Sequence, residues 1–282
     1  MLRILKRCLG AAVLLSLVLF GLGYYRTRNL RDTDGPQIIL DAASITVSVT
    51  DGEEALLRGI RASDRKDGDV TASLVLQGLS NFVEKGRRTM TVAAFDSDNN
   101  VTVATREVVL EDYVSPRFSL DRPLSFPIGT QESELVRYVQ VADCLDGDLS
   151  GEVVVEMENP EAWLDTSVEG TARLLYTVVN SAGDVAELPL TVQIYNSAEY
   201  SRATTLELSS YLVYLKRYES FDPWQYVVSM WKNGEELPAA RSQIQIADPV
   251  NNTVPGVYEV IYTVSDSGSD RVTQVRLPVI VE

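Results

Sequence analysis

Three glycines each open the same pattern of residues, and this repeat constrains the fold more than any other feature of the chain. Gly86, Gly170 and Gly256 lie 84 and 86 residues apart and begin the stretches GRRTMTVAAFDSDNN, GTARLLYTVVNSAGD and GVYEVIYTVSDSGSD. In each stretch, apolar side chains stand four, six and eight residues after the glycine. This period of two is typical of a strand with one buried face. The spacing predicts three copies of one compact β module.

Turn residues close each stretch, and a second alternating strand follows. The turns are predicted at 96–99, 180–183 and 266–269, and the second strands at 101–110, 185–194 and 272–281. Each strand–turn–strand unit therefore predicts a hairpin. The apolar positions expected to enter the three cores are Met90, Val92, Ala94, Leu174, Tyr176, Val178, Val260, Tyr262 and Val264.

The chain of 282 residues is long enough for two or three domains. After residue 31 it has many short strands, frequent turn signals and no long segment with helical periodicity, which favours an all-β fold of three tandem antiparallel β-sandwiches. We expect a tail and anchor helix over 1–31 and modules over 32–112, 113–195 and 196–282. Tandem modules with short linkers predict an extended rod.

The uncharged apolar run LGAAVLLSLVLFGLGYY occupies residues 9–25 and has basic residues on both sides. With Cys8 it gives eighteen residues, about 27 Å as a helix, which spans a bilayer core. We interpret it as one N-terminal transmembrane helix, an uncleaved signal anchor of a single-pass cell-membrane protein with an extracytoplasmic C-terminal body. The alternative is a cleaved signal peptide, with small residues at Gly21 and Gly23 for a peptidase.

Charge and composition exclude several classes of function. Residues 1–31 hold six basic and no acidic residues, which leaves 19 basic and 40 acidic residues after them, a net charge of −21. A body this acidic will not bind nucleic acid electrostatically. The chain has no histidine and only Cys8 and Cys144, so it lacks Ser-His-Asp triads and His-ligated zinc. We predict that it is not an enzyme and needs no cofactor.

An acidic motif lies upstream of the glycine in the first two modules. Asp-Gly-Asp stands at 67–69 and again at 146–148, each preceded by another aspartate and followed by an apolar residue and a hydroxyl residue. The third module has Asn233-Gly-Glu instead. Together with the glycine, the alternating strand and the Asx turn, this pattern resembles the Ig-like and cadherin-like repeat domains of Gram-positive surface proteins, and the Ig-like repeats of insecticidal crystal toxins.

The resemblance covers residues from about 36 to 282 and implies that each sandwich is Ig-like. The segment from Gly256 to Val260 also resembles a tyrosine corner, with Tyr258 two residues before a valine that replaces the usual cysteine. Such modules serve as spacers, adhesins and accessory domains. The resemblance therefore predicts fold more sharply than function.

The acidic loops are candidate calcium sites, because calcium takes 6–8 oxygen ligands and clustered carboxylates supply several. The alternative is turn formation, since Asp-Gly is common in turns and aspartate accepts hydrogen bonds from nearby backbone N–H groups. The sequence favours the turn. The candidate ligands are Asp64, Asp67, Asp69, Asp143, Asp146 and Asp148.

Aromatic residues crowd the third module and give a second candidate site. Exposed aromatic rings stack on sugars or anchor protein partners. Trp224, which follows a proline in an expected loop, and Trp231 are the candidate binding residues; the alternative is that they fill the core.

These features predict a non-catalytic, membrane-anchored protein for adhesion, display or spacing at a bacterial cell surface. Its expected partners are the membrane, through the N-terminal helix, and a surface protein or a cell-wall glycan. One alternative is a glycan- or peptidoglycan-binding module. Another is an accessory subunit of a membrane complex whose enzyme is a different chain.

Overall fold

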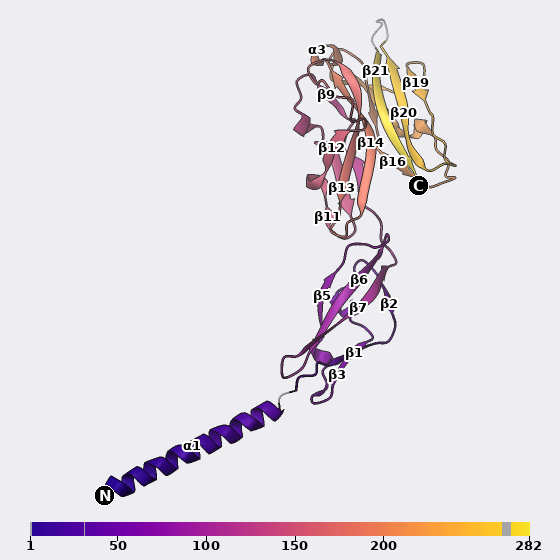
Figure 1. The fold of residues 1–282 in the computed structure, drawn as a ribbon. Helices are drawn as coiled ribbons and strands as arrows, with labels where there is room; N and C mark the ends of the chain where they lie inside the picture. Colours follow the sequence, from indigo (N-terminus) through magenta and orange to yellow (C-terminus); the bar gives the residue numbers. More distant parts are fainter. Residues whose placement is uncertain (1, 31, 267–271) are drawn as a thin grey trace. The chain divides into compact units, whose positions relative to one another are not determined.

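The computed structural model describes residues 2–30, 32–266 and 272–282, without the side chains of 2–9, 11 and 26–30. Two compact units emerge, Met1–Tyr113 and Val114–Glu282. The first contains helix α1 (Leu2–Leu30) and the first β module; the second contains the other two modules (Figure 1). The predicted turn at 266–269 falls almost entirely outside the described residues, as do the side chain of Cys8 and those of the flanking basic residues.

The apolar run at residues 9–25 lies within α1, so the prediction that this run is helical is confirmed. The described part of the chain contains no helix that is both long enough and apolar enough to cross a membrane.

The first module has two sheets, with strand orders β1-β3-β4 and β2-β7-β6-β5. Two short helical segments, α2 and η1, connect its strands. The elements are β1 (Gln37–Leu40), β2 (Ser44–Val47), α2 (Glu53–Leu56), β3 (Ile60–Asp64), β4 (Gly68–Asp69), η1 (Thr71–Ser73), β5 (Val75–Leu79), β6 (Arg87–Phe95) and β7 (Val101–Leu110).

The second module repeats this arrangement, with strand orders β11-β10-β8 and β12-β13-β14-β9. Its elements are β8 (Arg117–Leu120), β9 (Ser125–Pro127), η2 (Glu132–Glu134), β10 (Val139–Asp143), β11 (Gly147–Asp148), η3 (Ser150–Glu152), β12 (Val154–Met157), β13 (Gly170–Val179) and β14 (Val185–Tyr195).

The third module has strand orders β15-β17-β18 and β16-β21-β20-β19. Its elements are α3 (Ser197–Tyr200), β15 (Thr205–Leu208), β16 (Val213–Leu215), η4 (Pro223–Tyr226), β17 (Val227–Lys232), β18 (Glu235–Pro238), β19 (Ile244–Ala247), β20 (Gly256–Ser265) and β21 (Val272–Val281). The prediction of a nearly all-β chain with three two-sheet modules is confirmed.

The three predicted hairpins are β6–β7, β13–β14 and β20–β21. Their registers run from Arg87 opposite Val109, from Gly170 opposite Ile194 and from Gly256 opposite Val281. All nine apolar positions predicted for the cores are at most 3 % exposed. The alternation of apolar side chains therefore identified the buried face of each hairpin correctly.

One feature of the sheets differs from the predicted antiparallel pattern. The first strand of each module is divided between the two sheets, and its second half pairs in parallel with the last strand. The parallel pairs are β2 with β7, β9 with β14 and β16 with β21. Because the divided strand crosses between sheets without reversing, it runs in the same direction as the strand that ends the module.

A buried tyrosine supports the core of the second and third modules. Tyr176 and Tyr262 occupy the same position after the module glycine, and both rings are fully buried. The Tyr176 hydroxyl donates to the Leu135 carbonyl at 3.0 Å, and the Tyr262 hydroxyl donates to the Pro223 carbonyl at 2.7 Å. Each bond ties the hairpin to the helical segment that connects the two sheets of its module. Burial raises the pKa of both phenols, which stay protonated donors at neutral pH.

The tyrosine corner implied by the family resemblance is present in the third module. The Tyr258 hydroxyl donates a hydrogen bond to the carbonyl of Val254, four residues upstream, at 3.0 Å. This bond closes the turn that leads into β20, as in Ig-like domains.

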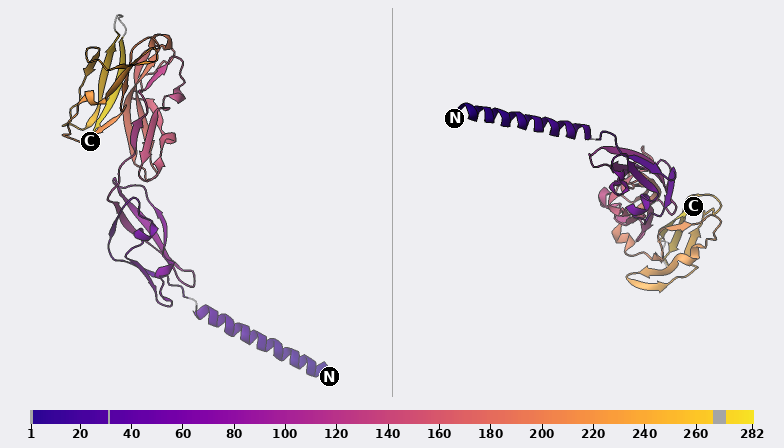
Figure 2. Two further views of the ribbon diagram at one scale, coloured as in Figure 1. Left: turned by 180° about the vertical axis from the view of Figure 1, so that it is seen from behind. Right: turned by 90° about the horizontal axis from the view of Figure 1, so that it is seen from below.

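The second and third modules lie side by side, as two views show (Figures 1 and 2). Leu212 belongs to the apolar core cluster of the second module, and Tyr214 and Ile280 pack against that cluster. The Tyr214 hydroxyl accepts a hydrogen bond from the backbone N–H of Phe118 at 3.0 Å, and the Arg117 guanidinium lies 4.5 Å from the centre of the Tyr214 ring. An in-line rod is therefore wrong for these two modules, because apolar residues of β16 and β21 cover the side of their neighbour.

We expect Tyr176→Phe to lower the free energy of unfolding by about 1 kcal/mol, because it leaves the buried Leu135 carbonyl without its donor. Tyr176→Ala should cost about 3–5 kcal/mol through the cavity it creates. Urea unfolding measures both changes. Tyr218→Phe, at a ring that is 68 % exposed, is the control and should leave stability unchanged. An equal effect of both phenylalanine variants would contradict the role of the hydrogen bond.

Candidate binding cleft between the second and third modules

The aspartates of the first acidic loop accept hydrogen bonds within their own module. Asp64 ends β3 and accepts from the backbone N–H groups of Lys66 at 2.7 Å and Asp67 at 2.9 Å. Asp67 accepts from the N–H and the hydroxyl of Ser97, and Asp69 accepts from the N–H of Thr71. Gly68 has φ +79°, a left-handed conformation that favours glycine. These contacts fix the loop against the β6–β7 turn.

The second acidic loop has the same construction. Asp143 accepts from the N–H groups of Leu145 and Asp146, while Asp146 accepts from the N–H of Ser181 at 2.6 Å. Asp148 accepts from the N–H of Ser150 at 2.9 Å. Within the described ranges, no three acidic or cysteine side chains are grouped closely enough to hold a metal ion. The contacts favour the turn interpretation, and calcium binding stays a prediction.

The two predicted tryptophans occupy different environments. Trp224 lies in η4 and packs against the core of the third module, with the Arg241 guanidinium 4.4 Å from its ring centre. Trp231 on β17 is 37 % exposed, and its indole N–H donates to Glu207 Oε2 at 2.6 Å. Trp231 lines a cavity that also contains residues of the second module.

That cavity, of about 360 Å³, lies at the junction of the second and third modules. Aromatic residues of both modules line it: Tyr138, Tyr195, Tyr200, Tyr211 and Trp231. The Arg122 guanidinium lies 4.8 Å from the centre of the Tyr138 ring, a cation–π distance. Because the second module supplies two of these five rings, Tyr138 and Tyr195, the aromatic surface does not belong to the third module alone.

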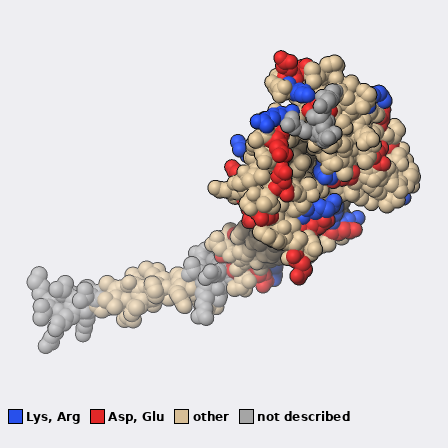
Figure 3. Space-filling view, turned by 90° about the horizontal axis from the view of Figure 1, so that it is seen from above, with Lys and Arg blue, Asp and Glu red and all other residues tan. Residues whose placement is uncertain are grey.

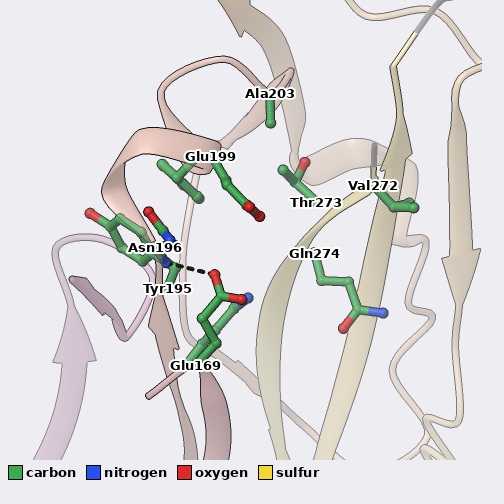
Figure 4. Close-up of a pocket in the computed structure, with 10 residues that line it drawn as sticks. Glu169, Tyr195, Asn196, Glu199, Ala203, Val272, Thr273 and Gln274 are labelled. Atoms are coloured by element: carbon green, nitrogen blue, oxygen red, sulfur yellow. Dashed lines mark hydrogen bonds between the residues drawn. The ribbon is translucent and has the colours of Figure 1, made fainter. Parts of the chain in front are cut away.

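A second cavity, of about 410 Å³, shares Tyr195 and Tyr200 with the first. In Figure 4 the carboxylates of Glu169 and Glu199 point into the space in front of Thr273 and Gln274 on β21. The Glu169 carboxylate also accepts a hydrogen bond from the backbone N–H of Asn196 at 2.8 Å. This cavity is therefore walled by hydrogen-bonding side chains of both modules.

Tyr195 and Tyr200 form the partition that both cavities share. Their ring centres are 4.2 Å apart with an interplanar angle of 26°, a stacked pair. Burial raises the pKa of both phenols, so each hydroxyl remains a donor at neutral pH. We call the two cavities and this partition the intermodular cleft.

The sequence pattern identified Trp231 of the intermodular cleft as a candidate and placed Tyr211 among the aromatic residues of the third module, but it missed Tyr195 and Tyr200. Tyr195 ends β14 and Tyr200 ends α3, so they lie at the module boundary, where alternation gives no signal. Sequence reasoning also missed Trp163, whose ring is 77 % exposed in the loop between β12 and β13. A tryptophan in the turn-rich segment 158–169 was the available signal.

Surface charge is mixed around the modules. On the face drawn in Figure 3, acidic and basic side chains are interspersed with uncharged ones. Within the intermodular cleft, Glu169, Glu199 and Glu207 outnumber the single cation Arg122. The cleft therefore has an acidic excess, which disfavours anionic ligands.

Comparison with known proteins gives fold-level likeness only. No protein-family model and no curated protein sequence matches the chain. Among solved structures, the CBM51-2 and INT domains of Clostridium perfringens ZmpB, in complex with GlcNAc, are 15 % identical and cover 54 % of this chain and 26 % of theirs, with a TM-score of 0.23. Human Protocadherin-24 EC1-2 is 13 % identical and covers 58 % of this chain and 99 % of its own, with a TM-score of 0.22.

A lipoprotein of Bacteroides thetaiotaomicron is 10 % identical and covers 86 % of this chain and 98 % of its own, with a TM-score of 0.20. The chain spans 26, 30 and 49 % of the length of the first three structures it resembles. The likeness is to Ig-like and cadherin-like repeat domains in general and carries no argument about function. A Gram-positive surface origin and a similarity to crystal toxins stay predictions.

We expect the first module to lose stability in acid partly through Asp64. Hydrogen bonds from the backbone N–H groups of Asp67 and then Lys66 lower the pKa of Asp64. A lowered pKa means that this stabilisation is complete above the unfolded-state pKa of about 3.9 and is lost as the pH falls through the folded-state pKa. Asp64→Asn should therefore reduce the fall in melting temperature below about pH 4.

Melting curves of the full chain between neutral and acidic pH measure this effect. Glu111→Gln, which changes an exposed carboxyl just beyond β7, serves as the control. The same acid profile in wild type and Asp64→Asn would contradict the assignment.

Calcium titration tests the acidic loops directly. Because their carboxylates already accept backbone hydrogen bonds, we expect millimolar calcium to leave the melting temperature unchanged. A rise with calcium that Asp67→Asn abolishes and magnesium does not reproduce would instead establish a calcium site.

Proposed function

We propose that this chain is a non-catalytic, extracytoplasmic protein whose Ig-like modules serve adhesion, display or spacing at a bacterial cell surface. The observation that carries the proposal is the buried contact between the second and third modules. Leu212 enters the neighbouring core, and Tyr214 and Ile280 pack on it. A pair of modules held in this way presents its surfaces in a fixed relation, which lowers the entropy cost of binding a partner.

We further propose that the N-terminal segment attaches the chain to the cell membrane. The proposal rests on the apolar run and its basic flanks in the sequence, and on exposed apolar side chains in α1. Eight of these are 53–73 % exposed: Val13, Leu14, Leu15, Leu17, Val18, Leu19, Phe20 and Leu22. Contiguous apolar surface of this kind favours burial in lipid or against another protein.

A glycan-binding role for the same modules is the second candidate. The intermodular cleft favours it, because aromatic rings and hydrogen-bonding side chains converge there from two modules. In this case adhesion would result from direct contact with a polysaccharide.

Protease treatment of intact cells tests position and attachment together. We expect external protease to degrade residues 32–282, and alkaline carbonate to leave the intact chain in the membrane pellet. A variant with Leu14, Leu17 and Phe20 changed to serine should move to the soluble fraction, whereas the matched variant with all three changed to methionine should not. Protection of the body in intact cells that is lost only on lysis would contradict exposure at the cell surface.

A further inference from the structure

We propose that the intermodular cleft binds an oligosaccharide that lacks acidic groups, with Tyr195, Tyr200 and Trp231 as the stacking residues. This inference rests on the second candidate function and names its ligand class and site. The ligand would lie across both cavities and contact the second and third modules together.

The aromatic surface fits the faces of sugar rings. A pyranose has C–H groups on its faces and hydroxyls around its rim, so it pairs with side chains that combine a flat apolar body and a polar tip. Tyrosine and tryptophan are such side chains. Trp231 is 37 % exposed, and its indole N–H is held by Glu207 at 2.6 Å, so its ring is fixed in orientation before a ligand arrives.

The polar side chains fit the rim of the sugar. Glu169 and Glu199 offer acceptors for hydroxyl donors, and Gln193 and Gln274 offer both donors and acceptors. The Thr273 hydroxyl donates to the Thr204 carbonyl and so offers an acceptor only. These groups lie on three separate segments, the start of β13, the region from β14 to α3, and β21. A ligand with hydroxyls in several directions matches this distribution better than one with a single polar end.

The size of the intermodular cleft favours an oligosaccharide over a single sugar. Its cavities of about 410 and 360 Å³ share the stacked pair Tyr195 and Tyr200. Each volume lies in the range of about 300–1,000 Å³ for small-molecule sites. Two adjacent cavities separated by stacked aromatic rings can each hold one sugar ring of a linked oligosaccharide.

Charge narrows the ligand class. Three glutamates against Arg122 repel uronic acids and phosphate-containing polymers, and accept neutral or amino sugars. The strands β14, β17 and β21 line the cleft from inside their sheets, whereas β9 and β15, which also contribute, are edge strands. An extended peptide commonly adds to a free sheet edge, so a cationic peptide is the competing ligand in the binding test.

Binding of the full-length chain in detergent to an array of neutral, amino and acidic oligosaccharides tests the proposal, followed by titration calorimetry with the best ligand. We expect binding to neutral or amino members and none to acidic ones. Tyr200→Ala and Trp231→Ala should each raise Kd about tenfold, and Trp231→Phe should recover most of the loss. Trp163→Ala removes a more exposed indole outside the cleft and should leave Kd unchanged.

Glu199→Gln is a second variant for the case in which Tyr200→Ala or Trp231→Ala unfolds the chain. The exposed Glu199 side chain makes no contact with either core cluster, so we expect this variant to fold. It should weaken binding of amino sugars more than binding of neutral ones. Chromatography of the bound glycan should recover it intact.

Three results would overturn the assignment. The first is no binding to any neutral or amino glycan, and the second is unchanged glycan binding in the folded variants Tyr200→Ala and Glu199→Gln. The third is that the cleft binds a cationic peptide and no glycan. A negative array with a protease-accessible body would end the glycan proposal and leave display or spacing in place. Cleavage of the glycan would instead contradict the non-catalytic proposal.

Discussion

The burial of alternate side chains along one long hairpin per module is the constraint on which the rest of the structure depends. In the second and third modules this hairpin also carries a buried tyrosine, whose hydroxyl donates to the helical segment that connects the two sheets. A one-residue slip of register would turn every core side chain outward. The fixed register in turn brings Asp67 and Asp146 to the hairpin turns, where each accepts bonds from a serine.

The sequence predicted the hairpins well because their signal is local. The alternation of apolar residues from Met90 to Ala94 and from Val260 to Val264 can be recognised within each strand, without information on the neighbouring modules. The apolar residues of both stretches are buried as expected. The parallel pairing of β2 with β7 was missed, since it joins segments about 60 residues apart and leaves no periodic trace. The side-by-side packing was missed because Leu212 and Tyr214 resemble ordinary strand residues of their own module.

The candidate site was predictable only in part for the same reason. Trp231 was identified by residue type, whereas Tyr138 and Tyr195 acquire meaning only when the third module packs beside them. Trp224, identified by the same reasoning, packs against its own core. Residue type gives candidates, and packing decides which of them remain accessible. The acidic loops illustrate a second limit, because the same aspartates suit a turn and a cation until their hydrogen-bond donors are known.

The parallel pairs between first and last strands have a mechanical consequence. In the first module, the divided strand β1–β2 begins the module and β7 ends it, with four residue pairs in register between β2 and β7. Tension applied to the two ends of the module would slide these strands along each other, so their hydrogen bonds would be loaded together rather than opened one at a time. A module closed in this way resists stretching more than a hairpin pulled from its open end.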